Sequence, residues 1–217
     1  MRRYIAEMMG TFFLVFAGTG AIIANDIFGG SIGHVGISLT FGLVVMAVIY
    51  VIGDLSGAHI NPAVSLGFYM LRRSQLKDTV MYVLSQCVGA ILASVLLCDV
   101  FPTHEGLGGT LPSVSMGGAF VYEYLMTFLL MLVILSVATG AKEKGLMAGV
   151  AIGGTVALEA LFAGPVTGAS MNPARSLGPA LVSGELGHLW LYLTAPMLGA
   201  ISAVPLCRYL HIQGCCQ

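Results

Sequence analysis

Apolar residues along the chain gather in six long stretches that are bounded by charged or turn-forming residues. These stretches cover residues 4–24, 34–53, 79–100, 116–139, 145–163 and 189–210. Each is close to the length of about 20 residues that a membrane-spanning helix needs. Two shorter segments begin at Asn61-Pro62 and at Asn172-Pro173 and are too short to span a bilayer of about 30 Å. The pattern therefore predicts an all-α membrane protein with six transmembrane helices and two half-helices.

The composition excludes several classes of protein. The chain is 57% hydrophobic and only 9% charged, whereas soluble domains carry about 25% charged residues. A soluble globular enzyme is therefore excluded, and so is a disordered chain, which would need low hydrophobicity and high charge. With 9 Lys and Arg against 10 Asp and Glu, the chain has no basic excess for nucleic acid. We expect an integral protein of the lipid bilayer.

The five cysteines show neither the spacing of metal ligands nor a paired disulfide framework, so we predict no metal site. Cys215 and Cys216 are interpreted as part of an incidental polar tail. No cofactor is expected, and the chain has no pair of catalytic carboxylates and no nucleophile–base combination. We therefore do not expect an enzyme.

The distribution of basic residues predicts the orientation of the chain. Lysine and arginine are retained in cytoplasmic loops, and eight of the nine basic residues fall on one side of the predicted spans. These are Arg2, Arg3, Arg72, Arg73, Lys77, Lys142, Lys144 and Arg208. Both termini are therefore predicted to be cytoplasmic, in a multi-pass protein of the cell membrane.

Two motifs occur twice in the chain. The segment around Glu7 recurs around Glu123, and the segment around Asn61 recurs around Asn172. Within a single channel domain over 1–217, these repeats divide the chain into halves of about 1–110 and 111–217, with three spans each. Because three is odd, the second half must enter the membrane upside down, which makes an inverted repeat.

Inversion brings the two half-helices together near the middle of the membrane. Proline fits the first helical turn, where its missing N–H costs nothing, and asparagine is a good N-cap. A plain helix cap at a surface turn is the alternative for each Asn-Pro pair. The residues before the caps, Gly57-Ala58-His59 and Gly168-Ala169-Ser170, are expected to be extended, with carbonyls that line a cavity. Irregular backbone at membrane depth is tolerated only in protein or beside water, so the arrangement indicates a pore.

The two boxes, Asn61-Pro62-Ala63 and Asn172-Pro173-Ala174, together with Glu7 and Glu123, resemble the aquaporins, or major intrinsic proteins. The resemblance covers essentially the whole chain. It implies six tilted helices plus two half-helices, one pore per subunit and a homotetramer. It also implies passive conduction of water or small uncharged solutes, without a cofactor.

The same resemblance implies a selectivity filter. By position, the filter would consist of Phe41, Ala160, Ala169 and Arg175. Water-selective members have histidine where this chain has Ala160, so a wider filter is expected. The segment 162–171, Tyr192-Leu193 and Ser176 resemble the nodulin-like branch, whose members pass glycerol, urea or metalloid hydroxides such as arsenous, boric or silicic acid. A water-selective aquaporin is the alternative.

Several charged residues would lie within or beside the pore. An arginine in the membrane interior is costly and normally functional, so Arg175 is predicted to exclude protons and cations together with the positive ends of the half-helices. Our hypothesis for Glu7 and Glu123 is that each accepts hydrogen bonds from the pore loop of its own half. Glu159 is interpreted either as a polar support of the filter loop or as a hydrogen-bonded packing residue. Asp54 is interpreted either as a pH-sensitive gate or as an interfacial carboxylate.

A coupled secondary transporter is a more distant alternative, because inverted repeats and broken helices also occur there. Such coupling needs an ionisable site at the midplane, and neither box contains a carboxylate. Glycines within the spans, among them Gly18, Gly89 and Gly199, are expected to allow close helix packing. Tyr82 and Tyr192 are expected in an aromatic belt at the membrane interface.

Overall fold

The computed structural model describes residues 1–138 and 146–210. Six long helices lie in these ranges: α1 (Arg2–Ile27), α2 (Gly33–Ser56), α4 (Leu76–Val100), α5 (Met116–Ala138), α7 (Ala148–Thr167) and α9 (Leu189–Leu210). Two short helices accompany them, α3 (Pro62–Met70) and α8 (Pro173–Ser183). The predicted ends of two spans at 139 and 145, the basic residues Lys142 and Lys144, and the tail with Cys215 and Cys216 lie outside the described residues.

Length and composition qualify all six long helices of the described ranges as membrane spans. Their most apolar windows have mean hydropathies between 1.5 and 2.5. Many large apolar side chains on these helices are exposed, which is the expected surface for contact with lipid or with another apolar partner. The prediction of six spans and two short helices is confirmed.

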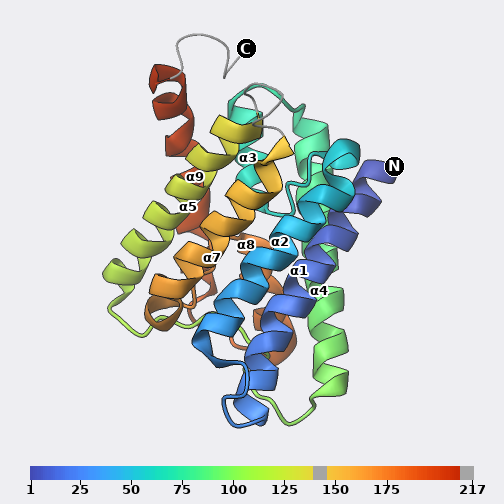
Figure 1. Ribbon diagram of the computed structural model, residues 1–217, viewed down its shortest axis with the longest axis vertical. Helices are drawn as coiled ribbons and strands as arrows, with labels where there is room; N and C mark the ends of the chain where they lie inside the picture. The colour runs from blue at the N-terminus through green and yellow to red at the C-terminus, as the bar shows by residue number, and fades with distance from the viewer. Residues whose placement is uncertain (139–145, 211–217) are drawn as a thin grey trace.

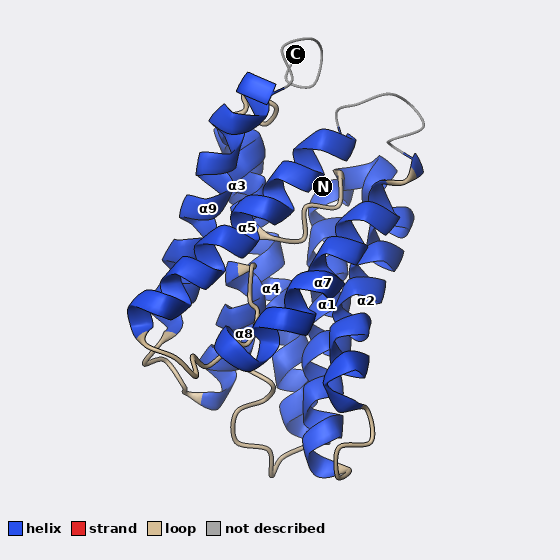
Figure 2. Ribbon diagram, turned by 60° about the vertical axis from the view of Figure 1, so that its left-hand side comes forward, coloured by secondary structure: helices blue, strands red, loops and turns tan. Residues whose placement is uncertain are grey.

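The long helices pack in two sets of three. Helix α1 packs along α4 and α2, and α5 packs along α9 and α7, while α2 and α7 pack against each other between the sets. Figures 1 and 2 show the resulting bundle from two directions. The start of α1 and the end of α9 lie at the same end of it (Figure 1).

Glycine allows the closest helix crossings. A Cβ atom added at Gly89 in α4 would lie 2.1 Å from the backbone oxygen of Met8 in α1. At Gly199 in α9 the same atom would lie 2.3 Å from the backbone oxygen of Tyr124 in α5. The two crossings occupy equivalent places in the two sets of helices, and any side chain there would push the backbones apart.

The short helices begin inside the bundle and run in opposite directions. Helix α3 runs toward the end that carries the start of α1, and α8 runs toward the other end (Figure 1). Each follows a long helix that stops at a left-handed glycine, with φ of 85° at Gly57 after α2 and 80° at Gly168 after α7. Glycine adopts this conformation without steric cost, so the chain can turn sharply into the loop that precedes each short helix.

Candidate pore

Asn61 and Asn172 cap the two short helices and join them. The Oδ1 atom of Asn61 accepts a hydrogen bond from Ala63 N (2.9 Å), and that of Asn172 accepts one from Ala174 N (3.0 Å). The side-chain amides reach across to the opposite loop. Nδ2 of Asn61 donates to Met171 O at 2.8 Å.

The side chain of Asn172 makes the equivalent bond to the first loop, because its Nδ2 atom donates to Ile60 O at 2.9 Å. A side-chain amide has two N–H donors, and each of these amides uses one of them on the opposite loop. Both asparagines also line a cavity of about 440 Å³ that runs between the helices. The second donor of each amide is therefore available to a molecule in this cavity.

Glu7 holds the first loop from behind. Its Oε1 atom accepts from His59 N (2.9 Å) and its Oε2 atom from Ile60 N (2.6 Å). The Ser56 hydroxyl and the Gln86 amide also donate to this carboxylate, at 2.7 and 2.8 Å. The Glu7 side chain is completely buried, so these donors replace the water that its carboxylate would otherwise bind.

Glu123 makes the same contacts with the second loop. It accepts from Ser170 N (2.9 Å), from Met171 N (2.8 Å) and from the Thr167 hydroxyl (2.7 Å). This side chain is also completely buried. Each half of the chain therefore fastens its own loop to a glutamate on its first long helix.

The loops are not extended, contrary to the expectation from the sequence. Ala58 and Ile60 have φ angles of 46° and 44°, and Ala169 and Met171 have φ angles of 43° and 53°. In an extended strand, successive groups point to opposite sides, so two neighbouring N–H groups could not meet one carboxylate. The left-handed residues turn both N–H groups toward the glutamate.

Five of the six residues whose carbonyls were expected to line the pore do line the cavity, namely Gly57, Ala58, His59, Ala169 and Ser170. Gly168 does not. It packs against Thr110, where an added Cβ atom would lie 3.1 Å from the Thr110 Cα atom. Ile60 and Met171, which the sequence did not single out, line the cavity and supply the carbonyls that receive the asparagine amides.

Arg175 and Phe41 face each other in the same cavity. The guanidinium carbon lies 5.0 Å from the centre of the Phe41 ring. Phe41 fits there because Gly18 has no side chain, since an added Cβ atom would lie 2.2 Å from the ring. Nη1 of Arg175 donates to Gly108 O (2.9 Å), whereas Nε and Nη2 have no partner among the described residues. The buried arginine therefore lies against an aromatic ring, with two of its nitrogens unpaired among the described residues.

Ala169 also lines the cavity, but Ala160 does not. The Ala160 side chain is buried, whereas Val156, one turn earlier on the same helix, lines the cavity. Three of the four expected filter residues are thus brought together around the cavity.

The family model described as Major intrinsic protein matches residues 1–206. The chain belongs to this family. The family predicted from the two Asn-Pro-Ala boxes is thereby confirmed.

Among curated members of the family, the chain is similar to plant proteins of the nodulin type. It is 47% identical to the Putative aquaporin NIP4-1 of Arabidopsis thaliana over 93% of this chain and 71% of that protein. It is 46% identical to Nodulin-26 of Glycine max over 93% of this chain and 75% of that one. Among solved structures, the aquaglyceroporin from Plasmodium falciparum is 28% identical, with a TM-score of 0.81 and 94% of both chains covered.

Glu159 differs from the buried glutamates Glu7 and Glu123 in its hydrogen bonding. Its side chain is completely buried, and neither carboxylate oxygen has a hydrogen-bond partner among the described residues. The interpretation of Glu159 as a hydrogen-bonded packing residue is therefore wrong, and no hydrogen bond to the described filter loop favours its interpretation as a polar support. Asp54 is exposed and lines the cavity close to Tyr50 and Gly53, toward the end of α2.

Two tyrosines expected at the membrane interface are buried instead. Tyr82 donates its hydroxyl to Ser56 O, and Tyr192 donates to Thr167 O, both at 2.7 Å. They satisfy the last carbonyls of α2 and α7, where each pore loop begins. The one signal for this role in the sequence is that each tyrosine follows the asparagine of its half's box at a similar spacing, 82 − 61 = 21 and 192 − 172 = 20 residues.

The loop after α4 was also missed. Residues 106–110 fold back onto the bundle, so that Gly108 O accepts from Arg175 and the Thr110 hydroxyl donates to Ser176 Oγ (2.8 Å). Gly108 has a φ of 65° and packs against Thr19, where an added Cβ atom would lie 2.7 Å from the backbone oxygen. No regular pattern marks such a loop in the sequence.

Proposed function

We propose that the cavity is the pore of a passive channel for water and small uncharged solutes. Membership of the major intrinsic protein family supports a channel for water and small solutes. The observation that carries the proposal is the set of buried donors around one cavity. Asn61, Asn172 and Arg175, whose side chains carry N–H donors, all line it. A solute that leaves water can replace its lost hydrogen bonds there.

Apolar side chains make up much of the remaining pore wall. They include Val45, Ile49, Leu130, Ile134 and Ile152. A solute therefore meets both hydrogen-bonding groups and hydrocarbon in the cavity. This combination orders small polar molecules in the pore and offers no site that would hold them tightly, so they can leave again.

Ion exclusion follows from the two short helices and Arg175. Both helices point their N-termini, which carry partial positive charge, toward the middle of the pore. Arg175 adds a full positive charge within the cavity. Cations and protons therefore meet an electrostatic barrier that neutral molecules do not.

The filter we propose consists of Phe41, Ala160, Ala169 and Arg175. The methyl group at position 160 leaves more room than the histidine of water-selective members. This favours glycerol, urea or metalloid hydroxides such as arsenous, boric or silicic acid as permeants besides water.

Stopped-flow swelling of vesicles tests the function and the filter together. We expect vesicles with the wild-type protein to admit water, glycerol, urea and arsenous acid faster than protein-free vesicles. Ala160→His should lower solute entry by about tenfold, equivalent to about 1.4 kcal/mol of barrier, because the imidazole narrows the filter. Water entry should change less.

Phe162→His provides the matched control, because Phe162 lies on the same helix with an exposed side chain. This variant should admit solutes as the wild type does. Entry of water alone into wild-type vesicles would refute the wide filter and favour the water-selective alternative. Entry no faster than in protein-free vesicles would refute the channel.

We also propose an arrangement in the cell for this channel. The exposed apolar faces support a multi-pass protein of the cell membrane that assembles as a homotetramer, with a pore in each subunit. The described basic residues lie on the side where α1 begins and α9 ends, and they support cytoplasmic termini. The matched loops, caps and glutamates support a division into two inverted halves, about 1–110 and 111–217.

A further inference from the structure

The loop between α4 and α5 supplies the hydrogen-bond acceptor of the Arg175 guanidinium. Nη1 of Arg175 donates to Gly108 O at 2.9 Å, whereas Nε and Nη2 have no partner among the described residues. A single backbone carbonyl therefore fixes the direction of a guanidinium that lines the pore. Whatever holds this carbonyl in place also holds the filter, even if it lies outside the pore wall.

Leu107, the residue before Gly108, has an unfavourable backbone conformation. Its φ is 46°, in the left-handed region where a Cβ atom crowds the backbone. Its side chain is buried against Ile23 and Leu97, and its N–H donates to Nδ1 of His104 at 3.0 Å. Burial and this hydrogen bond together stabilise the turn that presents Gly108 O to the pore arginine.

His104 joins this turn to the end of α1. Its Nε2 atom lies 3.2 Å from Oδ2 of Asp26 in α1. Because Nδ1 accepts from Leu107 N–H, it carries no hydrogen, so the neutral ring has its hydrogen on Nε2 and donates it to Asp26. The His104 side chain is 14% exposed, so a proton from solution can reach it. The two contacts thus select one tautomer of a partly exposed imidazole.

Helices α1, α4 and α8 pack around this loop, because each supplies an apolar residue to the cluster of Leu107. Their charged or titratable residues near the loop, with that of the loop itself, are Asp26 on α1, Cys98 and Asp99 on α4, Glu105 in the loop and Arg175 on α8. Asp99 and Glu105 are exposed. Asp26 is the member of this set that contacts the imidazole directly.

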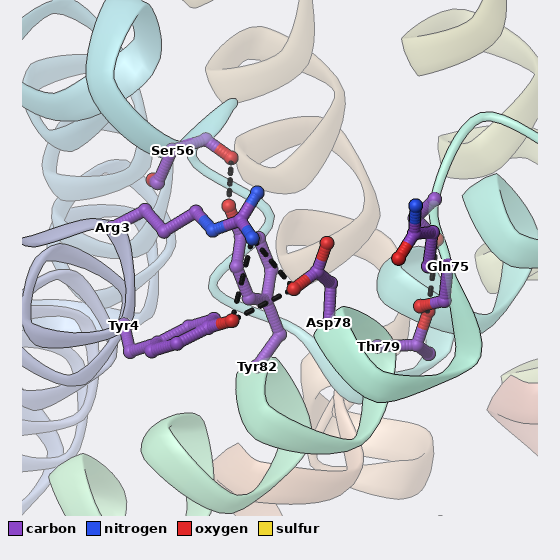
Figure 3. A network of polar contacts seen from close by, with 8 residues as sticks. Arg3, Tyr4, Ser56, Gln75, Asp78, Thr79 and Tyr82 are labelled. Carbon is purple, nitrogen blue, oxygen red and sulfur yellow. Dashed lines mark hydrogen bonds and ion pairs between the residues drawn. The ribbon is translucent and has the colours of Figure 1, made fainter. Parts of the chain in front are cut away.

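The other end of α1 is fastened differently. There Arg3 donates to Oδ1 of Asp78 in α4 at 2.6 Å, and the Tyr4 hydroxyl donates to the same oxygen at 2.7 Å (Figure 3). An arginine stays protonated in proteins, whereas histidine is the side chain that changes charge between about pH 5 and 8. Of these two links, the one through His104 is therefore the one that responds to pH in this range.

We propose that His104 is a positioning residue of the pore, which holds Arg175 through Leu107 and Gly108 while its imidazole is neutral. The inference rests on the proposed function of the cavity as a pore. The loop lies at the end of the bundle away from the start of α1, so the proton that titrates His104 comes from the solution on that side (Figure 1).

Protonation of His104 removes the acceptor from the turn. Both ring nitrogens of a charged imidazole carry hydrogen, so Nδ1 then faces Leu107 N–H as a second donor. The turn loses its hydrogen bond, and Gly108 O is held less firmly. The guanidinium of Arg175 can then turn toward the water in the cavity, where it obstructs the path. Permeation should therefore be fast above the range in which histidine titrates and slower below it.

Glycerol entry into vesicles with the wild-type protein, at pH 8 and at pH 5, tests this dependence. We expect entry to be about two- to tenfold slower at pH 5, the factor that corresponds to loss of one hydrogen bond. The rate should recover when the vesicles are returned to pH 8, which separates the effect from acid unfolding. Fast entry that is equal at the two pH values would overturn the proposal.

Two substitutions of His104 separate its two contacts. In His104→Asn, the amide oxygen lies near the position of Nδ1, accepts from Leu107 N–H and does not titrate, so glycerol entry should lose its pH dependence and stay fast. In His104→Gln, the amide nitrogen lies near Nε2 and reaches Asp26, but nothing accepts from Leu107 N–H. Entry should then be slow at both pH values.

His188→Asn is the matched control, because His188 is exposed in the loop between α8 and α9. This variant should keep the pH dependence of the wild type. A pH dependence that persists in His104→Asn would overturn the proposal. So would equal rates in His104→Asn and His104→Gln.

Hydrogen–deuterium exchange of the purified protein in detergent measures the loop without permeation. After correction for intrinsic exchange rates, residues 105–110 of the wild type should exchange about two- to tenfold faster at pH 5 than at pH 8. In His104→Asn the two rates should be equal. Unchanged protection of the wild-type loop at pH 5 would overturn the proposal. The expected exchange without glycerol entry at either pH would support the hold of His104 on the loop and refute the proposed function instead.

Discussion

Glu123 and Glu159 are both completely buried within the bundle, yet their surroundings differ. Glu123 receives two backbone N–H groups and one hydroxyl, whereas the Glu159 oxygens have no partner among the described residues. A buried carboxylate is stabilising only when its oxygens are satisfied. At the scale of the residue, the same side chain therefore has opposite effects on stability at the two positions.

We predict opposite results from the same substitution at these positions. Glu123→Gln should lower stability by about 1.5–3 kcal/mol for a hydrogen bond to a charged group, because its amide cannot accept from every donor of the loop. Glu159→Gln should leave the melting temperature unchanged or raise it, because no hydrogen bond is lost. Thermal unfolding in detergent measures both, and a Glu159→Gln variant that unfolds as early as Glu123→Gln would contradict the contrast.

At the scale of the element, α1 with α4 and α5 with α9 are equivalent crossings. Each pair approaches so closely that only hydrogen fits at the contact, at Gly89 in one pair and Gly199 in the other. Close approach is the main source of attraction between helices in a membrane, where lipid competes with apolar side chains. These crossings fix the two glutamates of α1 and α5 relative to the loops that they hold.

Substitution of helix glycines by alanine should separate the effect of close packing on stability from the effect of helix propensity. In a helix interior, alanine is favoured over glycine by about 0.5–1 kcal/mol. Gly154→Ala in α7 should show that gain, because nothing lies within 4 Å of the added methyl group. Gly89→Ala should instead be destabilising by about 1–3 kcal/mol, as for other overpacked sites. Melting temperatures of the two variants check this, and equal shifts would refute the role of the crossing.

At the scale of the whole molecule, the two short helices run in opposite directions from the inside of the bundle. Asn61 and Asn172 join them at their caps. The joint ties one half of the chain to the other at the centre of the bundle. The start of α1 and the end of α9 then lie on one side (Figure 1). The described basic residues on that side lie in α1, α4 and α9 or in the turn between α3 and α4; they are Arg2, Arg3, Arg72, Arg73, Lys77 and Arg208.

The orientation can be tested with epitope tags. A tag before Met1 and a tag after Gln217 should both be reached by antibody only after the cells are permeabilised. A tag in the loop 184–188, between α8 and α9, should be reached on intact cells. Labelling of either terminal tag on intact cells would contradict the orientation that the basic residues predict.

Much of the architecture was predictable because the bilayer imposes simple rules. Apolar length predicts the six spans, and a proline after asparagine predicts the starts of α3 and α8. The repeated motifs predict that Glu7 and Glu123 occupy matching places. The roles of Tyr82, Gly108 and Thr110 were not predictable, because each depends on a contact with a residue far away in the chain.

The sequence by itself determined the class of protein, the number of spans, the family and the residues that cap the two short helices, because these follow from local composition and spacing. The tertiary structure alone decided how these residues act. It turned Ala58 and Ile60 into the left-handed conformation that brings two N–H groups to one carboxylate. It also left Glu159 without a partner among the described residues and joined His104 to Asp26. Hydrogen-bond partners and cavities are properties of packing between distant segments, and no local pattern encodes them.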